Sequence, residues 1–308
     1  MKKHRWLFLL HIPLAVIAAT MITPLLFMLT TALSEPDQAM KASESIREMI
    51  FPKVWRWENF AEVWRVVPFL RYYLNSLGIA CAITVGQVFT SACAAYAFAR
   101  MQWKGRDIVF LAYLATLMVP GAVTMLPNFI AMKTTPEVLA QAFPTVDWLA
   151  IRYFGTGLSA PIVGRLVGLD SYFALTMPAM FSAYGTFMLR QFFLGLPKEL
   201  DEAAEIDGCG HWGIFWNVIL PLSKPAIASK AIFTFMGAWG SFLWPLVTTN
   251  EDALRTLPLG LQAFQGQYNT EWHLLMAASL LMLLPIVVIF LIGQRYFVGG
   301  LTVGAVKG

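Results

Sequence analysis

LDEAAEIDGCGHWGIFWNVILP, residues 200–221, lies between two apolar runs of this chain. Five acidic residues fall within nine positions in or just before it, namely Glu199, Asp201, Glu202, Glu205 and Asp207. Charge is costly inside lipid, so this segment is expected outside the hydrocarbon. Gly208 and Gly210 can end a helix, and the apolar pattern that follows stops at Pro221. The stretch therefore predicts a helix, a turn and a second helix between two membrane spans.

The composition predicts an integral membrane protein. Of 308 residues, 58% are hydrophobic and only 13% are charged, and the mean hydropathy is +0.62. A soluble domain is typically about a quarter charged. The sequence pI of 9.0 comes without a dense basic patch, so it indicates cationic loop ends near anionic lipid and no nucleic-acid partner.

Six apolar runs are long enough to cross a bilayer, because a helix needs about 20 residues to do so. The predicted spans are 6–33, 72–99, 108–132, 171–189, 225–248 and 272–292. The expected fold class is therefore an all-α membrane protein with six transmembrane helices. Pro120-Gly121 and Pro127 are expected to break the third span. The break is either a packing kink or part of a transport pathway.

The distribution of basic residues predicts which ends of the spans face the cytoplasm. An even number of spans puts both termini on one side, and Lys2, Lys3 and Arg5 lie at the start. The short connection 100–107 holds three bases, whereas 250–271 holds one base against three acids. Cytoplasmic loops carry the excess of Lys and Arg, so both termini and the 200–221 stretch are expected in the cytoplasm.

A family resemblance rests on Glu202-Ala203-Ala204, Gly208, Val218 and Leu220-Pro221. These residues and their spacing resemble the EAA loop of binding-protein-dependent ABC importer permeases. The resemblance implies a type I importer permease fold and a short coupling helix that docks into a groove on an ATPase subunit. The residues it implicates are Glu202, Ala203, Ala204, Asp207, Gly208, Leu220 and Pro221. The alternative is a solvated helix that simply joins two spans.

Other stretches resemble the carbohydrate-uptake branch of that family. They are RYYLNSL at 71–77, AAYAFARMQWKGRD at 94–107, PLSKPA at 221–226, FLWPL at 242–246 and QRYFVGGLTVGAVKG at 294–308. Taken together they resemble the smaller permease of maltose or glycerol-phosphate type importers. The apolar and charge patterns together with the resemblance, which covers about residues 60–308, predict three regions. They are residues 1–33 as a first helix with a cytoplasmic N-terminus, 34–71 as an outer segment, and 72–308 as the permease core, with the EAA loop at about 190–224.

The resemblance also implies partners. They are a second permease in a heterodimer, two ATPase subunits, an extracytoplasmic solute-binding protein, a carbohydrate and membrane lipid. ATP and Mg are expected on the ATPase subunits, with no cofactor on this chain, which is then not an enzyme itself. The implied location is the inner membrane of a bacterial or archaeal cell.

Polar and aromatic residues within the spans are candidates for the substrate pathway. Asn128, Tyr184, Trp239, Ser241 and Trp244 are expected to line it, and Gln87 either lines it or bonds across helices. Tryptophan faces suit the apolar face of a sugar ring. Polar groups within spans also bond helix to helix.

The branch usually places a polar and an acidic residue where this chain has Gly240 and Ser241. Loss of a buried carboxylate lowers the cost of an anion passing nearby. An anionic oligosaccharide is therefore one expectation. The alternative is that Gly240 permits close helix packing.

Residues 257–268, LPLGLQAFQGQY, form an expected outer loop. By resemblance it reaches the solute-binding protein, with contacts at Gly260, Gln262, Phe264 and Gln265. The alternative is a plain connection between helices.

Two other function classes have less support. A membrane-embedded enzyme needs convergent catalytic groups, but the four histidines are scattered, and Cys81, Cys93 and Cys209 form no metal-ligand pattern. The chain also lacks the phosphate-binding motif G-x-x-x-x-G-K-[ST] of ATPases. An ion-gradient-driven secondary transporter usually carries acids within its spans, and the predicted spans contain none.

Overall fold

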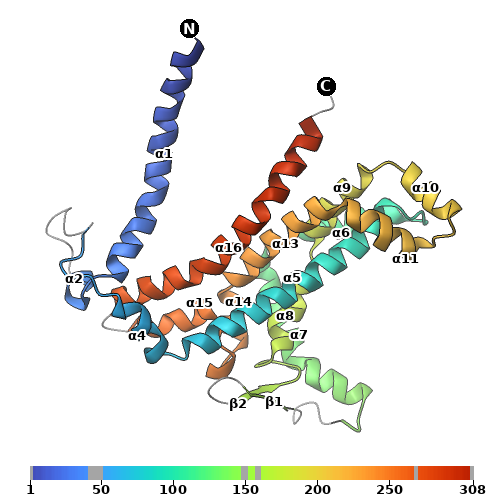
Figure 1. The fold of residues 1–308 in the computed structure, drawn as a ribbon. Coiled ribbons are helices and arrows are strands. Elements are labelled where there is room, and N and C mark those ends of the chain that lie inside the picture. The colour runs from blue at the N-terminus through green and yellow to red at the C-terminus, as the bar shows by residue number, and fades with distance from the viewer. Residues whose placement is uncertain (1–2, 41–50, 147–151, 157–160, 267–269, 306–308) are drawn as a thin grey trace. The chain divides into compact units, whose positions relative to one another are not determined.

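The structure is a computed structural model that describes residues 3–40, 51–146, 152–156, 161–266 and 270–305 (Figure 1). These residues are almost entirely helical, as the sequence predicts, apart from one two-stranded hairpin. The chain divides into two compact units. Unit 1 comprises Met1–Leu70 and Gly260–Pro285, and unit 2 comprises Arg71–Leu259 and Ile286–Gly308.

Unit 1 contains the N-terminal helices and the start of the last helix. Its elements are α1 (Lys3–Ala32), α2 (Pro36–Met40), α4 (Glu58–Val66), the 3-10 turn η5 (Leu261–Phe264) and the first part of α16 (Trp272–Ala305). The buried Asn59 amide donates hydrogen bonds to the carbonyls of Ala32 at 2.8 Å and Ser34 at 2.9 Å. These bonds fix α4 against the end of α1. Part of the predicted outer segment 34–71, residues 41–50, lies outside the described residues.

Unit 2 contains the other elements. They are α5 (Phe69–Ala99), α6 (Arg106–Ala115), η1 (Thr116–Met118), α7 (Gly121–Ala142), β1 (Arg152–Thr156), β2 (Pro161–Arg165), α8 (Tyr172–Thr176), η2 (Met177–Met180), α9 (Ala183–Leu194), α10 (Glu199–Ile206), α11 (His211–Ile214), the π-helical turn η3 (Phe215–Ile219), α12 (Leu220–Leu222), α13 (Lys224–Trp239), α14 (Leu243–Thr248), η4 (Asp252–Leu254), α15 (Leu257–Gly260) and the rest of α16. The helix α5 begins in unit 1, and α15 ends there.

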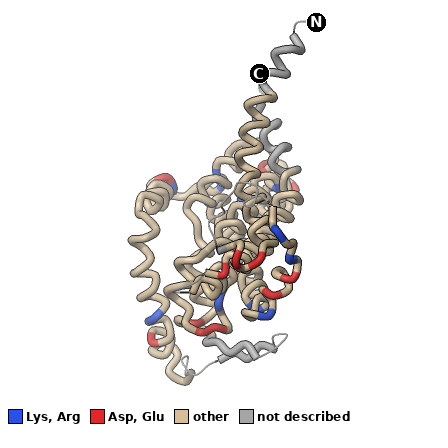
Figure 2. The backbone as a smooth tube through the Cα atoms, turned by 90° about the vertical axis from the view of Figure 1, so that its left-hand side faces the viewer, with Lys and Arg blue, Asp and Glu red and all other residues tan. Residues whose placement is uncertain are grey.

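Three described helices are long and apolar enough to cross a membrane: His11–Ala32, Phe69–Ala99 and Trp272–Gln294. Two bent pairs raise the number to five if each pair is one span: Arg106–Met118 with Gly121–Ala142, bent by 101°, and His211–Leu222 with Lys224–Trp239, bent by 79°. Charged residues are few along the backbone and separated by long uncharged stretches (Figure 2). The first, second and sixth predicted spans correspond to continuous helices. The described residues do not establish a count of six.

The third predicted span breaks at Pro120 and Gly121, as expected. Pro120 adopts an extended conformation with ψ of 138° and caps α7. The expected second break at Pro127 is wrong, because α7 continues through Pro127 and Pro136 to Ala142, beyond the predicted end at Met132. Part of the long connection 133–170 is therefore helical, and β1 and β2 form an antiparallel hairpin within it.

The fourth predicted span, 171–189, is not one continuous helix. It consists of α8, η2 and α9, with an extended residue at Phe181. The Ser171 and Ser182 hydroxyls each accept a backbone N–H three residues on, at 3.0 Å, and thereby begin separate helices. The fifth span is also interrupted, because α13 ends at Trp239 and α14 begins at Leu243.

The core of unit 2 lies where the end of α5 meets α9, α10, α11 and η3. Ala92, Ala95 and Ala99 of α5 are buried there against Leu189 and Phe193 of α9. Small side chains let helix backbones approach closely, as the alanine-rich pattern of this span predicts. The close packing also holds the EAA segment against the end of a long apolar helix.

Candidate functional site

The EAA segment forms the short helix α10, and its local sequence explains both ends. Acidic residues occupy its first turn, where they complement the helix dipole. Gly208 follows the last turn with φ of +85°, a conformation that favours glycine. The Cys209 N–H donates to the Ala204 carbonyl at 2.9 Å and the Gly208 N–H to the Glu205 carbonyl at 3.0 Å. These bonds close the helix and turn the chain toward α11.

The two alanines of the EAA motif face different surroundings. Ala204 is buried in the core of unit 2, whereas Glu202 and Ala203 are exposed. Asp207 and Gly208 are exposed as well. Ile206, which the sequence analysis did not single out, is 86% exposed. Ile206 thus shares the exposed face of α10 with acidic residues, outside the predicted spans.

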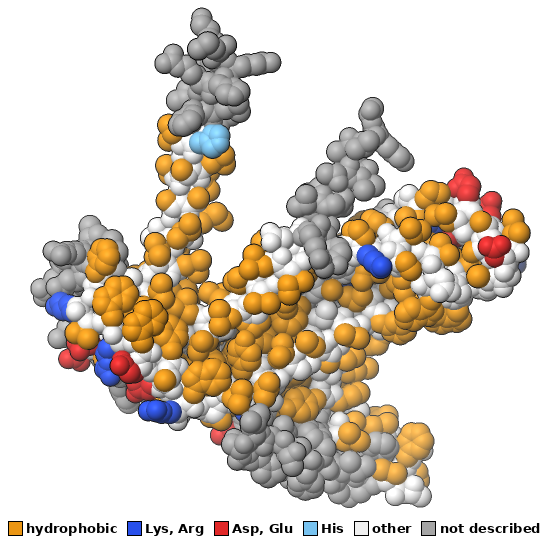
Figure 3. Space-filling view, viewed as in Figure 1, with side chains coloured by type: hydrophobic (Ala, Val, Ile, Leu, Met, Phe, Trp, Pro, Cys, Tyr) orange, Lys and Arg blue, Asp and Glu red, His pale blue; other side chains and the backbone are white. Residues whose placement is uncertain are grey.

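Acidic side chains gather at the end of unit 2 that carries α10 and α11 (Figures 1 and 3). The motif residues Leu220 and Pro221 lie in α12, where Leu220 packs against the core and Pro221 is exposed. The buried Ile219 precedes them. The motif is thus brought together around one core, with an exposed face on α10.

Arg100 ties α10 to α5 through an ion pair that the sequence analysis missed. Its guanidinium lies 3.2 Å from the Asp201 carboxylate, with side chains only 4% and 17% exposed. It also donates to the backbone carbonyls of Phe193 at 2.8 Å and Leu196 at 3.0 Å. Arg100 therefore joins the end of α5, the end of α9 and the first turn of α10.

Burial raises the pKa of the Asp201 carboxyl above its ordinary value. Glu205 adds to this rise, while Arg100 and Lys198 oppose it. The ion pair therefore only partly offsets the cost of placing this carboxylate against the core.

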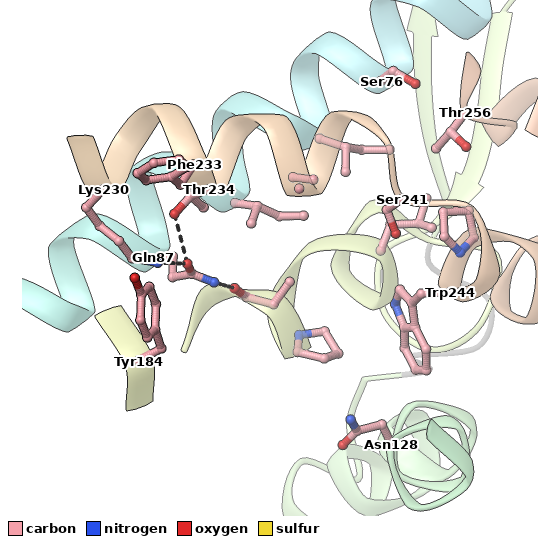
Figure 4. A pocket seen from close by; sticks show the side chains of 18 residues that line it. Ser76, Gln87, Asn128, Tyr184, Lys230, Phe233, Thr234, Ser241, Trp244 and Thr256 are labelled. Atoms are coloured by element: carbon pink, nitrogen blue, oxygen red, sulfur yellow. Dashed lines mark hydrogen bonds between the residues drawn. The ribbon is translucent and has the colours of Figure 1, made fainter. Parts of the chain in front are cut away.

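Unit 2 also contains a cavity of about 510 Å³ between α5, α7, α8, η2, α9, α13 and α14. Its walls mix apolar side chains with hydroxyl, amide and indole groups (Figure 4). A volume of about 300–1,000 Å³ suits a small-molecule ligand. The cavity is therefore a candidate part of a substrate pathway.

Four of the five predicted pathway residues line this cavity: Asn128, Tyr184, Ser241 and Trp244. The Trp244 indole donates to the Ala174 carbonyl at 2.8 Å, which holds its ring in place. The fifth, Trp239, is fully buried and packs instead against the rings of Tyr73 and Phe235. Gln87 also lines the cavity, and its amide donates a hydrogen bond to the Ala179 carbonyl of η2.

Lys230 was missed in the sequence analysis, although it lines the cavity from the middle of α13. A single lysine inside the apolar run 225–248 was the available signal, because charge inside a span is rare without a function. Gly240 is the C-terminal cap of α13. If this residue carried a Cβ, the nearest atom would be the Met236 carbonyl oxygen of the same helix, at 3.5 Å. Close packing of a second described helix does not explain this glycine.

The predicted binding-protein contacts lie in and beside η5 of unit 1. Gln262 and Gln265 are exposed, whereas Gly260 and Phe264 are buried. Gln267 and Tyr268 of the predicted loop lie outside the described residues. Among the residues that the structure describes, no group of three or more His, Cys, Asp or Glu could hold a metal ion.

Comparison with known proteins gives consistent results at three levels. Residues 87–303 match the family described as binding-protein-dependent transport system inner membrane component. The arabinooligosaccharides transport system permease protein AraQ of Halalkalibacterium halodurans is 33% identical over 301 residues, which covers 97% of this chain and 96% of the relative. The sn-glycerol-3-phosphate transport system permease protein UgpE of Yersinia pestis is 33% identical over 299 residues, or 94% of each chain.

A solved structure of a bacterial ABC transporter involved in the import of the acidic polysaccharide alginate has the same fold. One of its chains matches with a TM-score of 0.75 and 17% identity, covering 96% of this chain and 98% of that one. A structure of the alginate transporter in complex with a pentasaccharide-bound periplasmic protein matches with a TM-score of 0.63 and 13% identity. At these identities the similarity concerns the fold alone, which is that of the type I importer permeases.

Proposed function

Because this chain belongs to the family of binding-protein-dependent transport system inner membrane components, we propose that it is the permease subunit through which such a system imports a carbohydrate. The observation that carries this proposal is identity of 33% over nearly the full length of permeases named for arabinooligosaccharides and for sn-glycerol-3-phosphate. The family is a membrane component and not an enzyme, and hydrolysis of ATP lies on partner subunits. ATP and Mg therefore bind those subunits and not this chain.

The exposed face of α10 is the proposed site of coupling to an ATPase subunit. Glu202, Ala203 and Ile206 are exposed there, and the face is acidic around one apolar side chain. Ile206 would insert into an apolar groove of the ATPase, while Glu202 and Asp207 set the register through polar contacts. Ala204 and the turn at Gly208 hold the helix in position.

Motion of α10 would reach the membrane through packed elements. Arg100 bonds α10 and α9 to the end of α5, and Ala204 packs against the same helix. A rigid chain of buried contacts can transmit a displacement between two discrete arrangements. Closure of the ATPase subunits on ATP would thereby move α5, whose other residues line the cavity.

The cavity is the proposed part of the pathway that this chain contributes. Asn128, Tyr184, Ser241 and Trp244 offer an amide, two hydroxyl groups and an indole ring to a sugar. Hydroxyl and amide groups bond sugar hydroxyls, and aromatic faces cover the apolar face of the ring. Trp239 would support this wall from behind through its ring contacts with Tyr73 and Phe235.

The remaining partners follow from the same proposal. A second permease would complete the pathway as a heterodimer, and a solute-binding protein would deliver the sugar on the outer side, near Gln262 and Gln265. Gly260 and the buried Phe264 would support that loop. Both termini and α10 would lie on the cytoplasmic side of a bacterial or archaeal inner membrane. Membership of this family favours ATP-driven import over a transporter driven by an ion gradient.

The test is the ATPase activity of the assembled complex in lipid nanodiscs. Binding protein loaded with the cognate oligosaccharide is expected to stimulate hydrolysis several-fold over unloaded binding protein. Stimulation by a loaded amino-acid-binding protein, with none by any carbohydrate, would contradict the assignment of a carbohydrate.

A further inference from the structure

Lys230 is the only charged residue among those that line the cavity, all of which the structure describes. Its side chain lies on α13 and is 4% exposed. Burial of an ammonium group inside a membrane protein is costly unless an anion compensates its charge. Lysines in this position generally face a partner or a ligand.

The neighbours of Lys230 orient its ammonium without neutralising it. Lys230 Nζ donates to Gln87 Oε1 at 2.5 Å, and Thr234 Oγ1 donates to the same oxygen at 2.9 Å (Figure 4). Gln87 Nε2 in turn donates to the Ala179 carbonyl at 2.6 Å, which fixes the amide with its oxygen toward Lys230. A lysine carries three donors, and a neutral amide oxygen engages only one of them.

Within the described part of the chain, no carboxylate forms an ion pair with Lys230; the ion pairs there join Arg100, Arg106 and Arg255 to aspartates. The remaining electrostatic neighbour is the Tyr184 ring, whose centroid is 5.9 Å from Nζ. A cation–π contact at this distance is weak. The positive charge in the cavity is therefore left without a counter-ion.

A glycine in α9 leaves space for the side chain of Lys230. A Cβ on Gly185 would overlap Lys230 Cε and would lie 2.6 Å from Ser91 Oγ. The absence of a side chain at position 185 leaves the room in which the lysine stem extends between α9 and α13. Residues from α5, α9 and α13 thus jointly position one cation.

We propose that Lys230, held by Gln87 and Thr234, binds the carboxylate or phosphate group of an acidic carbohydrate as it passes through the cavity. This inference rests on the proposed function and specifies its substrate class. Ser241 in place of an acid leaves the wall free of a competing carboxylate. Two unused ammonium donors suit an anionic oxygen, and Asn128 and Ser241 offer bonds to hydroxyl groups of the same molecule.

The experiment measures ATP-dependent uptake by proteoliposomes that contain the complete complex and its binding protein. Three labelled probes are compared: arabinotriose as the neutral sugar, trigalacturonate for a carboxylate and sn-glycerol-3-phosphate for a phosphate. Lys230→Gln is expected to lower uptake of the acidic probe about 10- to 100-fold relative to wild type, the range for loss of one charge-assisted hydrogen bond. Lys230→Arg keeps the charge and is expected to retain most of that uptake.

Thr234 offers a second, independent variant. It lies four residues after Lys230 on α13, so Thr234→Asp would place a carboxylate beside the ammonium. This internal counter-ion is expected to compete with the acidic probe and lower its uptake about as much as Lys230→Gln does. Thr234→Asn is the control of matched size without the charge, and it is expected to lower the ratio of acidic to neutral uptake less than Thr234→Asp does.

The outcomes separate this inference from the proposed function. Preferential loss of acidic uptake in Lys230→Gln and Thr234→Asp supports the inference, and the acidic probe that is carried identifies carboxylate or phosphate. Equal loss of neutral and acidic uptake would mean that Lys230 only ties helices together, which overturns it. Uptake of arabinotriose alone by wild type overturns the inference but not carbohydrate import. Uptake of none of the three, by a complex with active ATPase, overturns both.

Discussion

Replacement of Arg100 by methionine should loosen α10 from the rest of unit 2. The substitution keeps an apolar stem but removes the guanidinium, which lies 3.2 Å from the Asp201 carboxylate and donates to the Phe193 and Leu196 carbonyls. Loss of one partner of a buried ion pair costs about 3–5 kcal/mol. Because the Asp201 side chain keeps 17% of its exposure, we expect the lower end, about 3 kcal/mol, or roughly a 150-fold larger opened population of α10.

The assay is hydrogen exchange of peptides that cover 199–209, measured on the assembled complex in nanodiscs. The amide hydrogens of Asp207, Gly208 and Cys209 are bonded within this segment and report its opening. Arg106→Met is the matched control, because the Arg106–Asp107 pair has side chains 28% and 75% exposed. An exposed pair contributes about 0–1 kcal/mol, so this control should change the exchange less than about fivefold.

The raised pKa of Asp201 gives the first prediction a pH dependence. Loss of Arg100 removes the group that lowers this pKa, so it rises further. A carboxyl with a raised pKa in the folded state destabilises that state once the pH rises above the pKa. The extra exchange of Arg100→Met should therefore be greatest above the raised pKa of Asp201 and shrink as the pH falls through it. The double variant Arg100→Met with Asp201→Asn should show less extra exchange. Equal exchange in Arg100→Met and Arg106→Met would refute the reasoning.

Three further predictions concern docking, turn geometry and topology. Ile206→Ser should weaken assembly with the ATPase subunits about 30-fold in pull-down titrations, because about 2 kcal/mol of apolar burial is lost. Leu222→Ser, also at an exposed apolar position, should leave assembly unchanged, and equal effects of the two variants would argue against Ile206 as the docking residue. Gly208→Val should reduce uptake far more than Gly208→Asn, because asparagine tolerates the φ of +85° at this position and valine does not. A larger loss in Gly208→Asn would exclude backbone conformation as the reason for a glycine here. A cysteine at Asp252 should react with an impermeant thiol reagent added outside intact cells, while cysteines at Lys104 and Lys198 should not; the opposite pattern would invert the orientation.

Local signals explain why the coupling segment was predictable from sequence. Five acids in nine positions cannot lie in lipid, and Gly208 supplies a turn conformation that few residues adopt. The break at Pro120 followed in the same way, because a proline that lacks an N–H is followed by a glycine, which weakens a helix further, whereas Pro127 alone did not break α7. Each of these features depends on a few neighbouring residues.

Contacts between distant residues explain what the sequence did not predict. Arg100 and Asp201 are 101 positions apart. Several other basic residues in the sequence could equally have been chosen as the partner of Asp201. The division of the fourth span into α8 and α9 depends on Ser171 and Ser182 acting as helix caps. Serines inside apolar runs more often bond their own helix, as Ser229 and Ser279 do here. The pairing of Lys230 with Gln87 likewise needed the packing of α13 against α5.

The energy source for import is the most direct test of the central claim. Proteoliposomes holding the complete complex would be loaded with ATP and Mg on the side of α10 and given labelled oligosaccharide with binding protein on the other side. The account predicts accumulation that requires both ATP and binding protein and is lost in Arg100→Met but not in Arg106→Met. Accumulation driven by a proton or sodium gradient without ATP would contradict it.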